Sequence, residues 1–477
     1  MQMIIGGKKV DASNGKTIDV LNPATLQVID TIPAATKDDI NLAVTNAVEG
    51  FKEWSQLCVG ERVKVLRRFL ELYRENMEEL ARLVSEDGGK TINDARACVD
   101  WTADIIDTYI EWARYMNTDV IPEGIREGAK NDLVFTVRQP LGVVVAIIPF
   151  NYPVDQLTHK AIPALVMGNS LIVKPATVTP RADIKYVELL LEAGVPANAA
   201  QIVTGKGGKV GEWLASDPRI AKVAFTGSTA VGKRLGEICM GNMHHTSLEL
   251  GGNDALIVLD DANLDWAADM CVGHRTANAG QTCCSPKRFI VQKGVKDAFI
   301  AKLIERLEKL KFGDLMDEST TLSPVVSPEA AVDAEKQIKH TVDQGGKILY
   351  GGERFNQTFI QPTIIEVSKD TDIAKDMEVF APVFPIIPCE DMYEAVEIAN
   401  SSVYGLSSGV FSQDIQRLLY VAKHIQAGAC NLNGTGMCRT CDIPFGGWKQ
   451  SGIGREGGKY TLEAMSQLKT IHINKSF

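Results

Sequence analysis

The sequence predicts an α/β protein built of two lobes. Short β-rich runs alternate with helical patterns between Val143 and Leu259, which is typical of βαβ units around a parallel sheet. A second alternating series follows Asp260. Two such series, each with strands of its own, predict two lobes with a cleft. Ligands of such sheets bind at the carboxyl ends of the strands.

Three helices are expected in the first quarter of the chain, at Ile40–Trp54, Glu61–Asp87 and Ile92–Met116. Thr36, followed by Asp38, is a candidate cap for the first helix. The second helix stops at Gly88 and carries an apolar face of Val63, Leu66, Phe69, Leu70 and Tyr73. Asp132–Gln139 then alternates and ends at Pro140, which predicts an edge strand or an extended arm.

The first alternating series has five expected strands, at Val143–Ile148, Leu171–Val173, Gln201–Thr204, Val223–Thr226 and Ala255–Leu259. The helices expected between them are Asp155–Val166, Ala182–Ala193, Lys209–Ala215 and Ala230–Cys239. The second series includes Val295–Lys311 and Asp391–Asn400 as helices, and Gly346–Tyr350 and Phe384–Pro388 as strands. Lys469–Asn474 alternates again and predicts a final strand.

Composition excludes several classes of protein. The 477 residues suffice for about three domains, and 45% hydrophobic and 23% charged residues exclude a disordered chain, a collagen or a coiled coil. A net charge of −10 without a long basic run argues against a nucleic-acid partner. The longest apolar run, Leu141–Phe150, is too short to cross a membrane. The N-terminus lacks a secretion signal and the ten cysteines are scattered, so we expect a cytoplasmic protein.

Two glycine-rich turns follow strands and open helices. The turn from Gly227 to Lys233 has the spacing of a phosphate-binding P-loop, but Arg234 replaces the required Ser or Thr, so we do not expect an NTPase. The turn from Gly205 to Gly211 does not fit a dinucleotide fingerprint. Taken alone, each turn is more often a simple strand-to-helix connection than a ligand site. Together they favour a nucleotide, because free N–H groups at helix N-termini bind phosphate.

Three side chains are candidates for chemistry. Cys283 follows Gly-Gln near an expected helix start, where the helix dipole would lower its pKa, although a buried structural cysteine is the alternative. Glu249 ends a short apolar strand, where a carboxylate is costly unless it has a task or a partner. Asn151 occupies a tight turn, bounded by prolines, at a strand end.

Seven motifs occur together in this order: Pro149-Phe-Asn151-Tyr-Pro153, Lys174-Pro-Ala-Thr177, Phe225-Thr-Gly-Ser228, Glu249-Leu-Gly-Gly252, Gly280-Gln-Thr-Cys283, Glu378-Val-Phe380-Ala-Pro382 and Pro444-Phe-Gly-Gly-Trp-Lys-Gln-Ser-Gly452. With them the chain resembles the NAD(P)-dependent aldehyde dehydrogenase superfamily over nearly its whole length. The resemblance implies two doubly wound α/β domains and a small β oligomerisation arm. Residues 1–120 and 140–250 would bind the cofactor, 251–450 would form the catalytic domain, and 121–139 with 460–477 would form the arm of a homodimer or homotetramer.

The resemblance also implies roles for the three candidates. Cys283 would attack the aldehyde carbon to give a thiohemiacetal, whose oxyanion would lie between the Asn151 side chain and the Cys283 backbone N–H. Hydride would leave to the nicotinamide, and Glu249 would activate water to hydrolyse the remaining thioester.

The same resemblance implies a set of cofactor contacts. Glu378 would hold the nicotinamide ribose, Phe380 would pack beside the ring, and Lys174 would reach the adenosine ribose. The whole set is Ile148, Pro149, Phe150, Lys174, Thr177, Gly207, Gly211, Phe225, Gly227, Ser228, Val231, Leu250, Gly251, Glu378 and Phe380. Many NAD-preferring relatives have Glu where this chain has Thr177. Thr177 carries no charge and its hydroxyl can donate to a phosphate, so we expect use of NADP, with NAD as the alternative.

Several positions depart from the common family pattern. Cys284 is a second thiol beside the expected nucleophile. We expect it to be inert, and the alternative is a strained or transient disulfide. Ala381 and Phe150 replace a usual Gly and Trp, the former as in branches resembling lactaldehyde, phosphonoacetaldehyde and non-phosphorylating glyceraldehyde-3-phosphate dehydrogenases. The CxxC pair Cys438 and Cys441 stands alone, so no metal site is expected.

Arg439 and Cys284 are the candidate substrate contacts, and Arg439 is a candidate because of its charge. Branches that take anionic aldehydes use an arginine in a similar place, and a guanidinium grips a carboxylate in a bidentate fork. The alternative is an ordinary surface salt bridge. Two other functions stay open at this point: a CoA-acylating enzyme, which retention of Glu249 disfavours, and a non-catalytic protein on the same scaffold, which retention of Cys283 disfavours.

Overall fold

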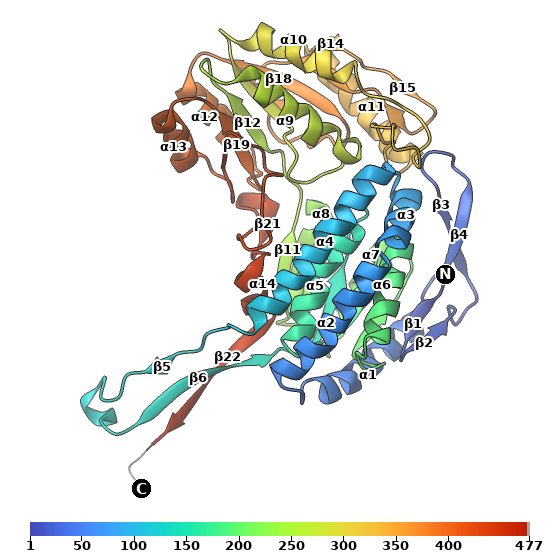
Figure 1. The fold of residues 1–477 in the computed structure, drawn as a ribbon, viewed down its shortest axis with the longest axis vertical. Coiled ribbons are helices and arrows are strands. Elements are labelled where there is room, and N and C mark those ends of the chain that lie inside the picture. The colour runs from blue at the N-terminus through green and yellow to red at the C-terminus, as the bar shows by residue number, and fades with distance from the viewer. Residues whose placement is uncertain (475–477) are drawn as a thin grey trace.

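The structure, a computed structural model, describes residues 1–474 and contains two open sheets with helices packed on them. Figure 1 shows most of the second half of the chain, in yellow-green to orange, above the first half, in blue to green, whereas the red C-terminal elements descend beside the first half. A long arm extends to one side. The expected α/β fold is confirmed.

The first sheet has the strand order β2-β1-β9-β8-β7-β10-β11-β21. Its strands are β1 (Met3–Ile5), β2 (Lys8–Val10), β7 (Val143–Ile147), β8 (Ser170–Lys174), β9 (Ala200–Ile202), β10 (Ile220–Thr226), β11 (His245–Glu249) and β21 (Gly452–Ile453). The strands from β7 to β11 pair in parallel, while β1 and β21 join antiparallel to them. Every residue of β7 and β8 is buried, as expected of strands covered on both faces.

The helices of the first half are α1 (Lys37–Trp54), α2 (Val59–Glu75), α3 (Met77–Gly88), α4 (Ile92–Ala113), α5 (Pro153–Val166), α6 (Arg181–Glu192), α7 (Gly207–Ala215) and α8 (Thr229–Gly241). Helices α1 and α5 to α8 pack against strands of this sheet, whereas α2, α3 and α4 pack on α5 and α6. The predicted cap Thr36 accepts from the Asp39 N–H, and Asp39 rather than Asp38 completes the capping box.

The prediction of one helix over Glu61–Asp87 is wrong. The chain forms two helices that meet at Asn76, whose backbone is non-helical (φ −109°, ψ 11°) and whose Nδ2 donates to the Leu72 carbonyl. An amphipathic pattern does not reveal such a break, because the apolar face continues on both sides of it. The predicted apolar face, from Val63 to Tyr73, is buried.

The reading of the first quarter as helices alone also missed strands. β1 and β2 extend the first sheet, and β3 (Thr17–Leu21) pairs with β4 (Val28–Pro33) in a separate hairpin. These strands have three to six residues, so their alternation is too short to stand out.

The second sheet has the order β14-β17-β18-β13-β12-β19-β20 and is parallel except at β14. Its strands are β12 (Ala255–Val258), β13 (Arg288–Gln292), β14 (Lys347–Tyr350), β17 (Thr363–Glu366), β18 (Val383–Cys389), β19 (Ser408–Phe411) and β20 (Asn431–Leu432). Its helices are α9 (Leu264–Thr276), α10 (Lys296–Leu307), α11 (Pro328–Asp343), α12 (Met392–Asn400) and α13 (Ile415–His424). The strand expected at Ala255–Leu259 was placed in the first series, whereas β12 lies in the second sheet, between β13 and β19.

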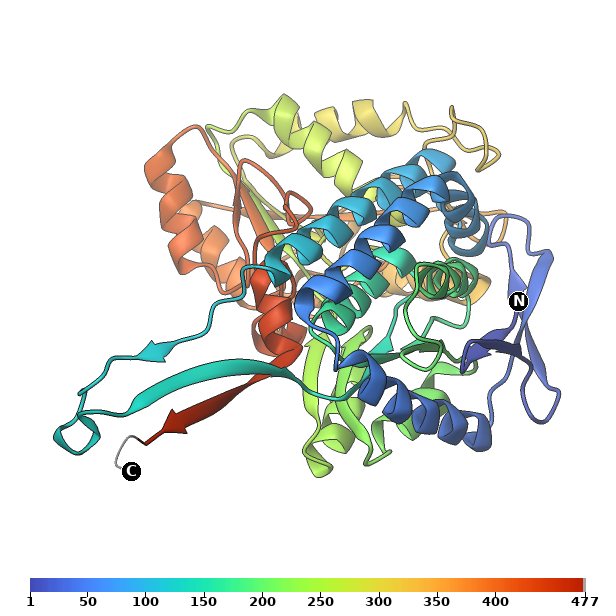
Figure 2. The ribbon, with the colours of Figure 1, turned by 60° about the horizontal axis from the view of Figure 1, so that its bottom comes forward.

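The arm consists of β5 (Val120–Ile121), β6 (Leu133–Pro140) and β22 (Ser466–Ile473), which pair antiparallel in the order β22-β6-β5. Figure 2 shows it projecting away from the body. The strand predicted at Asp132–Gln139 and the final strand are confirmed, and α14 (Gly458–Ala464) leads into the latter. The last three residues of the predicted arm segment, 475–477, lie outside the described residues.

The remaining elements are short: β15 (Arg354–Phe355), β16 (Phe359–Ile360), and the 3₁₀ turns η1 (Glu127–Ala129), η2 (Ala277–Gly280), η3 (Asp372–Ala374) and η4 (Lys449–Ser451). Within residues 1–474, no helix has the length and apolar character that a bilayer crossing requires.

Candidate active site

A cavity of about 1040 Å³ opens at the carboxyl ends of β7 and β10. These neighbouring strands mark the point where the strand order of the first sheet reverses, the usual ligand-binding place in such sheets. Segments that follow both strands line the cavity, and Cys283 and Glu378 from the second half of the chain complete its wall.

The cavity brings together almost all of the predicted site residues. Those that line it are Ile148, Pro149, Phe150, Asn151, Lys174, Thr177, Gly207, Gly211, Phe225, Gly227, Ser228, Val231, Leu250, Gly251, Cys283, Cys284, Glu378, Phe380 and Arg439. Glu249 alone among the predictions does not line it.

Two helices begin at the cavity, so both glycine-rich turns contribute to it. α7 starts at Gly207, and Ser228 is the N-cap of α8. A Cβ placed on Gly207 or Gly208 would meet nothing within 4 Å, which leaves open space over the first turn of α7. Free N–H groups at two converging helix N-termini fit the pyrophosphate of a dinucleotide.

Lys174 and Thr177 differ from expectation in their hydrogen bonds. The Thr177 hydroxyl donates to the Gly205 carbonyl at 3.0 Å, so the expectation that its proton is free for a phosphate is wrong for this structure. The Lys174 ammonium donates to the Pro175 carbonyl at 2.5 Å, and burial lowers the pKa of Lys174 to about 8. Both side chains still border the cavity.

Cys283 does not lie at a helix start, so the helix-dipole argument from the sequence is wrong. It lies in a turn between η2 and β13. Asn278 and Ala279 have φ values of 50° and 54°, which is strained backbone shortly before Cys283. Gly280 follows with φ 75°, and a Cβ there would lie 2.6 Å from the Ala381 carbonyl. Only glycine fits this close approach.

Asn151 is fixed to the Cys283 loop from both sides. Its Nδ2 donates to the Gln281 carbonyl at 2.9 Å, and Asn278 Nδ2 donates to the Asn151 carbonyl at 3.1 Å. An amide NH₂ carries two protons, so one remains for an oxyanion in the cavity. The structure thus holds an amide donor and a thiol in one rigid unit.

The thiols of Cys283 and Cys284 titrate as a pair, because they hydrogen-bond to each other. This bond raises the pKa of Cys283 and lowers the pKa of Cys284 to about 6, while burial raises both. The cations Arg439 and Lys287 lower the pKa of both thiols. The two thiols therefore share their proton losses, and the positive charges of Arg439 and Lys287 favour the thiolate form of the pair.

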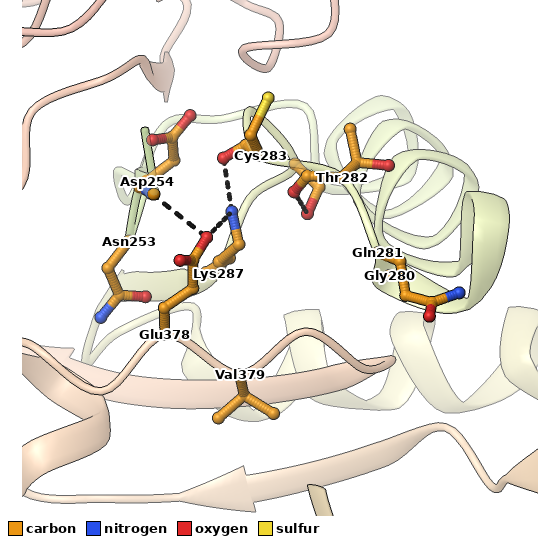
Figure 3. A network of polar contacts seen from close by, with 12 residues as sticks. Asn253, Asp254, Gly280, Gln281, Thr282, Cys283, Lys287, Glu378 and Val379 are labelled. Carbon is orange, nitrogen blue, oxygen red and sulfur yellow. Dashed lines mark hydrogen bonds and ion pairs between the residues drawn. The ribbon is translucent and has the colours of Figure 1, made fainter. Parts of the chain in front are cut away.

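Glu378 reaches the same loop through a buried lysine. The Lys287 ammonium donates to the Cys283 carbonyl at 2.5 Å and lies 3.3 Å from Glu378 Oε1 (Figure 3). The Gly252 N–H also donates to Glu378 Oε1, at 3.2 Å. The sequence contained this lysine four residues after Cys283, but no pattern singled it out.

Glu249 is buried, 4% exposed, and its carboxylate lies beside the Pro-Phe-Gly-Gly turn. A Cβ on Gly446 would lie 2.8 Å from Glu249 Oε1, and Oε2 has no hydrogen-bond partner within residues 1–474. Burial raises the pKa of Glu249, and the neighbouring Glu456 raises it further. Glu456 forms a buried ion pair with Lys160 at 2.8 Å. A carboxylate with a raised pKa and a free oxygen is suited to accept a proton.

The cavity wall also contains side chains that were not predicted as site residues: Lys90, Asp94, Trp101, Tyr152, Asp155 and Gln156. Lys90 is buried and its ammonium lies 3.6 Å from the centre of the Tyr152 ring. For Asp155 a signal was available in the sequence, namely a charged residue within the apolar helix α5, every residue of which is buried.

Cys438 is exposed and Cys441 is buried, and both are free thiols. Within residues 1–474 no group of three or more His, Cys, Asp or Glu side chains could hold a metal ion.

The sequence profile of the aldehyde dehydrogenase family matches residues 10–471. The chain belongs to the aldehyde dehydrogenase family. Among its relatives is glutarate-semialdehyde dehydrogenase from Pseudomonas putida, 38% identical over 475 residues, with 99% of this chain and 98% of that protein covered. Lactaldehyde dehydrogenase from Methanococcus aeolicus is 37% identical over 447 residues, covering 93% and 94%.

Further comparisons include both cofactors. Succinate-semialdehyde dehydrogenase [NADP(+)] from Escherichia coli is 36% identical over 476 residues, covering 99% of this chain and 97% of that protein. The crystal structure of an NAD-dependent aldehyde dehydrogenase from Sinorhizobium meliloti superposes with a TM-score of 0.96 at 35% identity, covering 100% and 95%. The protein is therefore an NAD(P)-dependent oxidoreductase of aldehydes, and the CoA-acylating and non-catalytic alternatives are not favoured.

Proposed function

We propose that this enzyme oxidises an anionic aldehyde to the carboxylic acid through a thioester on Cys283. The observation that carries the proposal is the single unit of the Cys283 turn and the Asn151 amide, which faces the same cavity as Glu378. The test is a panel of aldehydes with NAD and with NADP, read by the absorbance of the reduced cofactor.

The steps follow from the positions of the side chains. The Cys283 sulfur attacks the aldehyde carbon, and the remaining Asn151 Nδ2 proton with the Cys283 N–H stabilises the oxyanion. NAD(P), when bound, supplies the acceptor for the hydride that leaves this carbon. The cavity, the two helix N-termini and the Glu378 carboxylate fit such a dinucleotide.

Glu249 then removes a proton from the water that attacks the thioester carbon, and the Cys283 thiolate is the leaving group. The Glu249 carboxylate lies against Gly446 and does not line the cavity. We therefore propose that the Glu249 side chain turns toward Cys283 for this step.

Removal of the negative charge beside Glu249 should shift the pH dependence of deacylation. Below its pKa Glu249 is protonated and cannot accept a proton from water, so turnover falls on the acid side. Glu456→Gln removes a neighbour that raises the pKa of Glu249 and leaves Lys160 unpaired, and both changes lower that pKa. We expect the acid limb of kcat to move to lower pH.

The matched control is Glu463→Gln, because Glu463 is largely exposed and lies in the neighbouring helix α14. Its acid limb should stay where it is in the wild type. A limb that moves to higher pH in Glu456→Gln would contradict the assigned base.

The substrate class follows from Arg439. Its guanidinium lies 4.4 Å from the centre of the Phe445 ring and borders the cavity beside Cys283 and Cys284. None of the ion pairs within residues 1–474 includes it, which disfavours the surface salt bridge. A cation without a carboxylate partner in a substrate cavity fits an anionic group on the aldehyde. Relatives named for glutarate and succinate semialdehydes support this proposal.

Arg439→Gln should therefore discriminate between matched four-carbon aldehydes. For succinate semialdehyde we expect kcat/KM to fall by about 10–100-fold, because a charge-assisted contact is lost. For butanal, which has no carboxylate, the change should stay within about threefold, in line with a packing effect. Equal losses for both aldehydes would show that Arg439 does not bind the anion.

For the cofactor we propose that NADP is accepted. Thr177 places no carboxylate near the expected ribose, and Lys174 adds positive charge. The Thr177 hydroxyl donates to the Gly205 carbonyl and not to a phosphate. The support for NADP is therefore that position 177 has no carboxylate that would repel the 2′-phosphate. Thr177→Glu should lower kcat/KM for NADP by about 10–100-fold relative to NAD. A wild type that does not use NADP, or an unchanged ratio in the variant, would contradict this.

We propose further that residues 1–120 and 140–250 bind the cofactor, that 251–450 form the catalytic domain, and that the arm mediates a homodimer or homotetramer. Exposed apolar side chains on the arm support subunit contacts: Val120, Leu133, Leu468 and Ile473. All ten cysteines are free, which supports a reducing compartment such as the cytoplasm.

A further inference from the structure

Lys287 is a buried cation to which none of the roles above assigns a task. Its side chain is 1% exposed, although lysine is almost never fully buried unless it is paired. Its ammonium has two partners from distant parts of the chain, the carbonyl of Cys283 and the carboxylate of Glu378 (Figure 3). One charge thus joins the backbone of the nucleophile to the carboxylate expected to hold the cofactor.

The contacts around Glu378 fix the direction of its carboxylate. Oε1 lies between the Lys287 ammonium, at 3.3 Å, and the Gly252 N–H, at 3.2 Å. Oε2 lies so close to the neighbouring turn that a Cβ on Gly251 would be 2.5 Å away. Because Oε1 has two donors from the protein, the carboxylate cannot rotate freely at the cavity wall. It is preorganised to accept a hydrogen bond from a ribose hydroxyl.

The same ammonium acts on the thiol. The charged and titratable groups that face the Cys283 thiol or the Lys287 ammonium are Cys284, Arg439, Glu378 and Asp254. A positive charge near a cysteine favours its thiolate. Lys287 and Arg439 supply that charge, and the anionic Glu378 and Asp254 offset part of it.

We propose that Lys287 is a positioning residue that holds Glu378 for the cofactor ribose and stabilises the thiolate of Cys283. This inference rests on the proposed roles of Cys283 and Glu378. It predicts that one substitution changes two properties together, the reactivity of the thiol without cofactor and the affinity for the cofactor.

The test compares Lys287→Met, Lys287→Arg and wild type. In the cofactor-free protein, the rate of Cys283 alkylation by iodoacetamide is followed against pH, and fragmentation of the labelled peptide separates Cys283 from Cys284. Loss of the charge should move the midpoint up by about one pH unit and slow alkylation at neutral pH by about tenfold. NADP binding, titrated by protein fluorescence, should weaken several-fold. Lys287→Arg keeps the charge and should restore the midpoint.

The matched control is Lys293→Met, because Lys287 directly precedes β13 and Lys293 directly follows it, but Lys293 is exposed and pairs with Glu390. It should leave both measurements unchanged. If Lys287→Met does not fold, as judged by circular dichroism, Lys287→Gln takes its place with the same expectation.

A neutral Lys287 variant with the wild-type midpoint and the wild-type NADP affinity would overturn the inference. So would a Lys293→Met variant with the same shift. Failure of the proposed function is separate, since it would appear as a wild type that is alkylated normally but reduces no cofactor with any aldehyde.

Discussion

Cys283→Ala should abolish aldehyde oxidation. Removal of a covalent nucleophile takes away the first bond that the substrate forms, so we expect kcat to fall by on the order of 10⁴-fold or more. The measurement is cofactor reduction with the best aldehyde of the panel, after cofactor binding to the variant has been verified by fluorescence titration.

Cys284→Ala is the matched control, because Cys284 is the adjacent thiol and is hydrogen-bonded to Cys283. It is buried with Leu406 and Phe445, so we expect a packing cost of about 1–3 kcal/mol in stability and a loss of activity below about tenfold. An inactive Cys284→Ala beside an active Cys283→Ala would move the nucleophile by one residue. The comparison of the two variants is needed because Cys283 and Cys284 titrate as a pair, so either sulfur could be the thiolate that attacks the aldehyde.

Glu249→Gln should slow thioester hydrolysis more than hydride transfer. A general base contributes about 10²–10⁴-fold, and here it acts mainly after the thioester has formed. Stopped-flow absorbance should show a rapid burst of about one reduced cofactor per chain, followed by slow turnover. If the burst disappears while iodoacetamide still alkylates Cys283 at the normal rate, Glu249 serves the first step instead.

The sequence predicted the fold where the local signals were strong. The buried apolar runs of β7 and β8 and the glycine-rich starts of α7 and α8 gave the parallel sheet and its ligand edge. The break at Asn76 and the short strands β1 to β4 were missed, because a continuous apolar face hides a break and the alternation within three to six residues is too short to stand out.

The candidate site was predicted largely from motifs rather than from periodicity. Asn151, Cys283 and Glu378 were expected together because their motifs resembled one family, and the structure places them on one cavity. What could not be predicted depends on tertiary contacts. The Thr177 hydroxyl donates a hydrogen bond to the Gly205 carbonyl, because the backbone of a distant turn passes beside it. The Glu249 carboxylate lies against Gly446 for the same reason.

Lys287 illustrates the same limit. In the sequence it is one lysine in a loop, and only the fold brings the Glu378 segment against it.

The proposed reaction passes through an acyl group on Cys283. The most direct measurement mixes Glu249→Gln with aldehyde and NADP or NAD, quenches the mixture in acid after the burst, and locates the acyl group by fragmentation of the labelled peptide. We expect about one acyl group per chain on Cys283 and none when the cofactor is omitted. An unmodified Cys283, or an acyl group on Cys284, would contradict it.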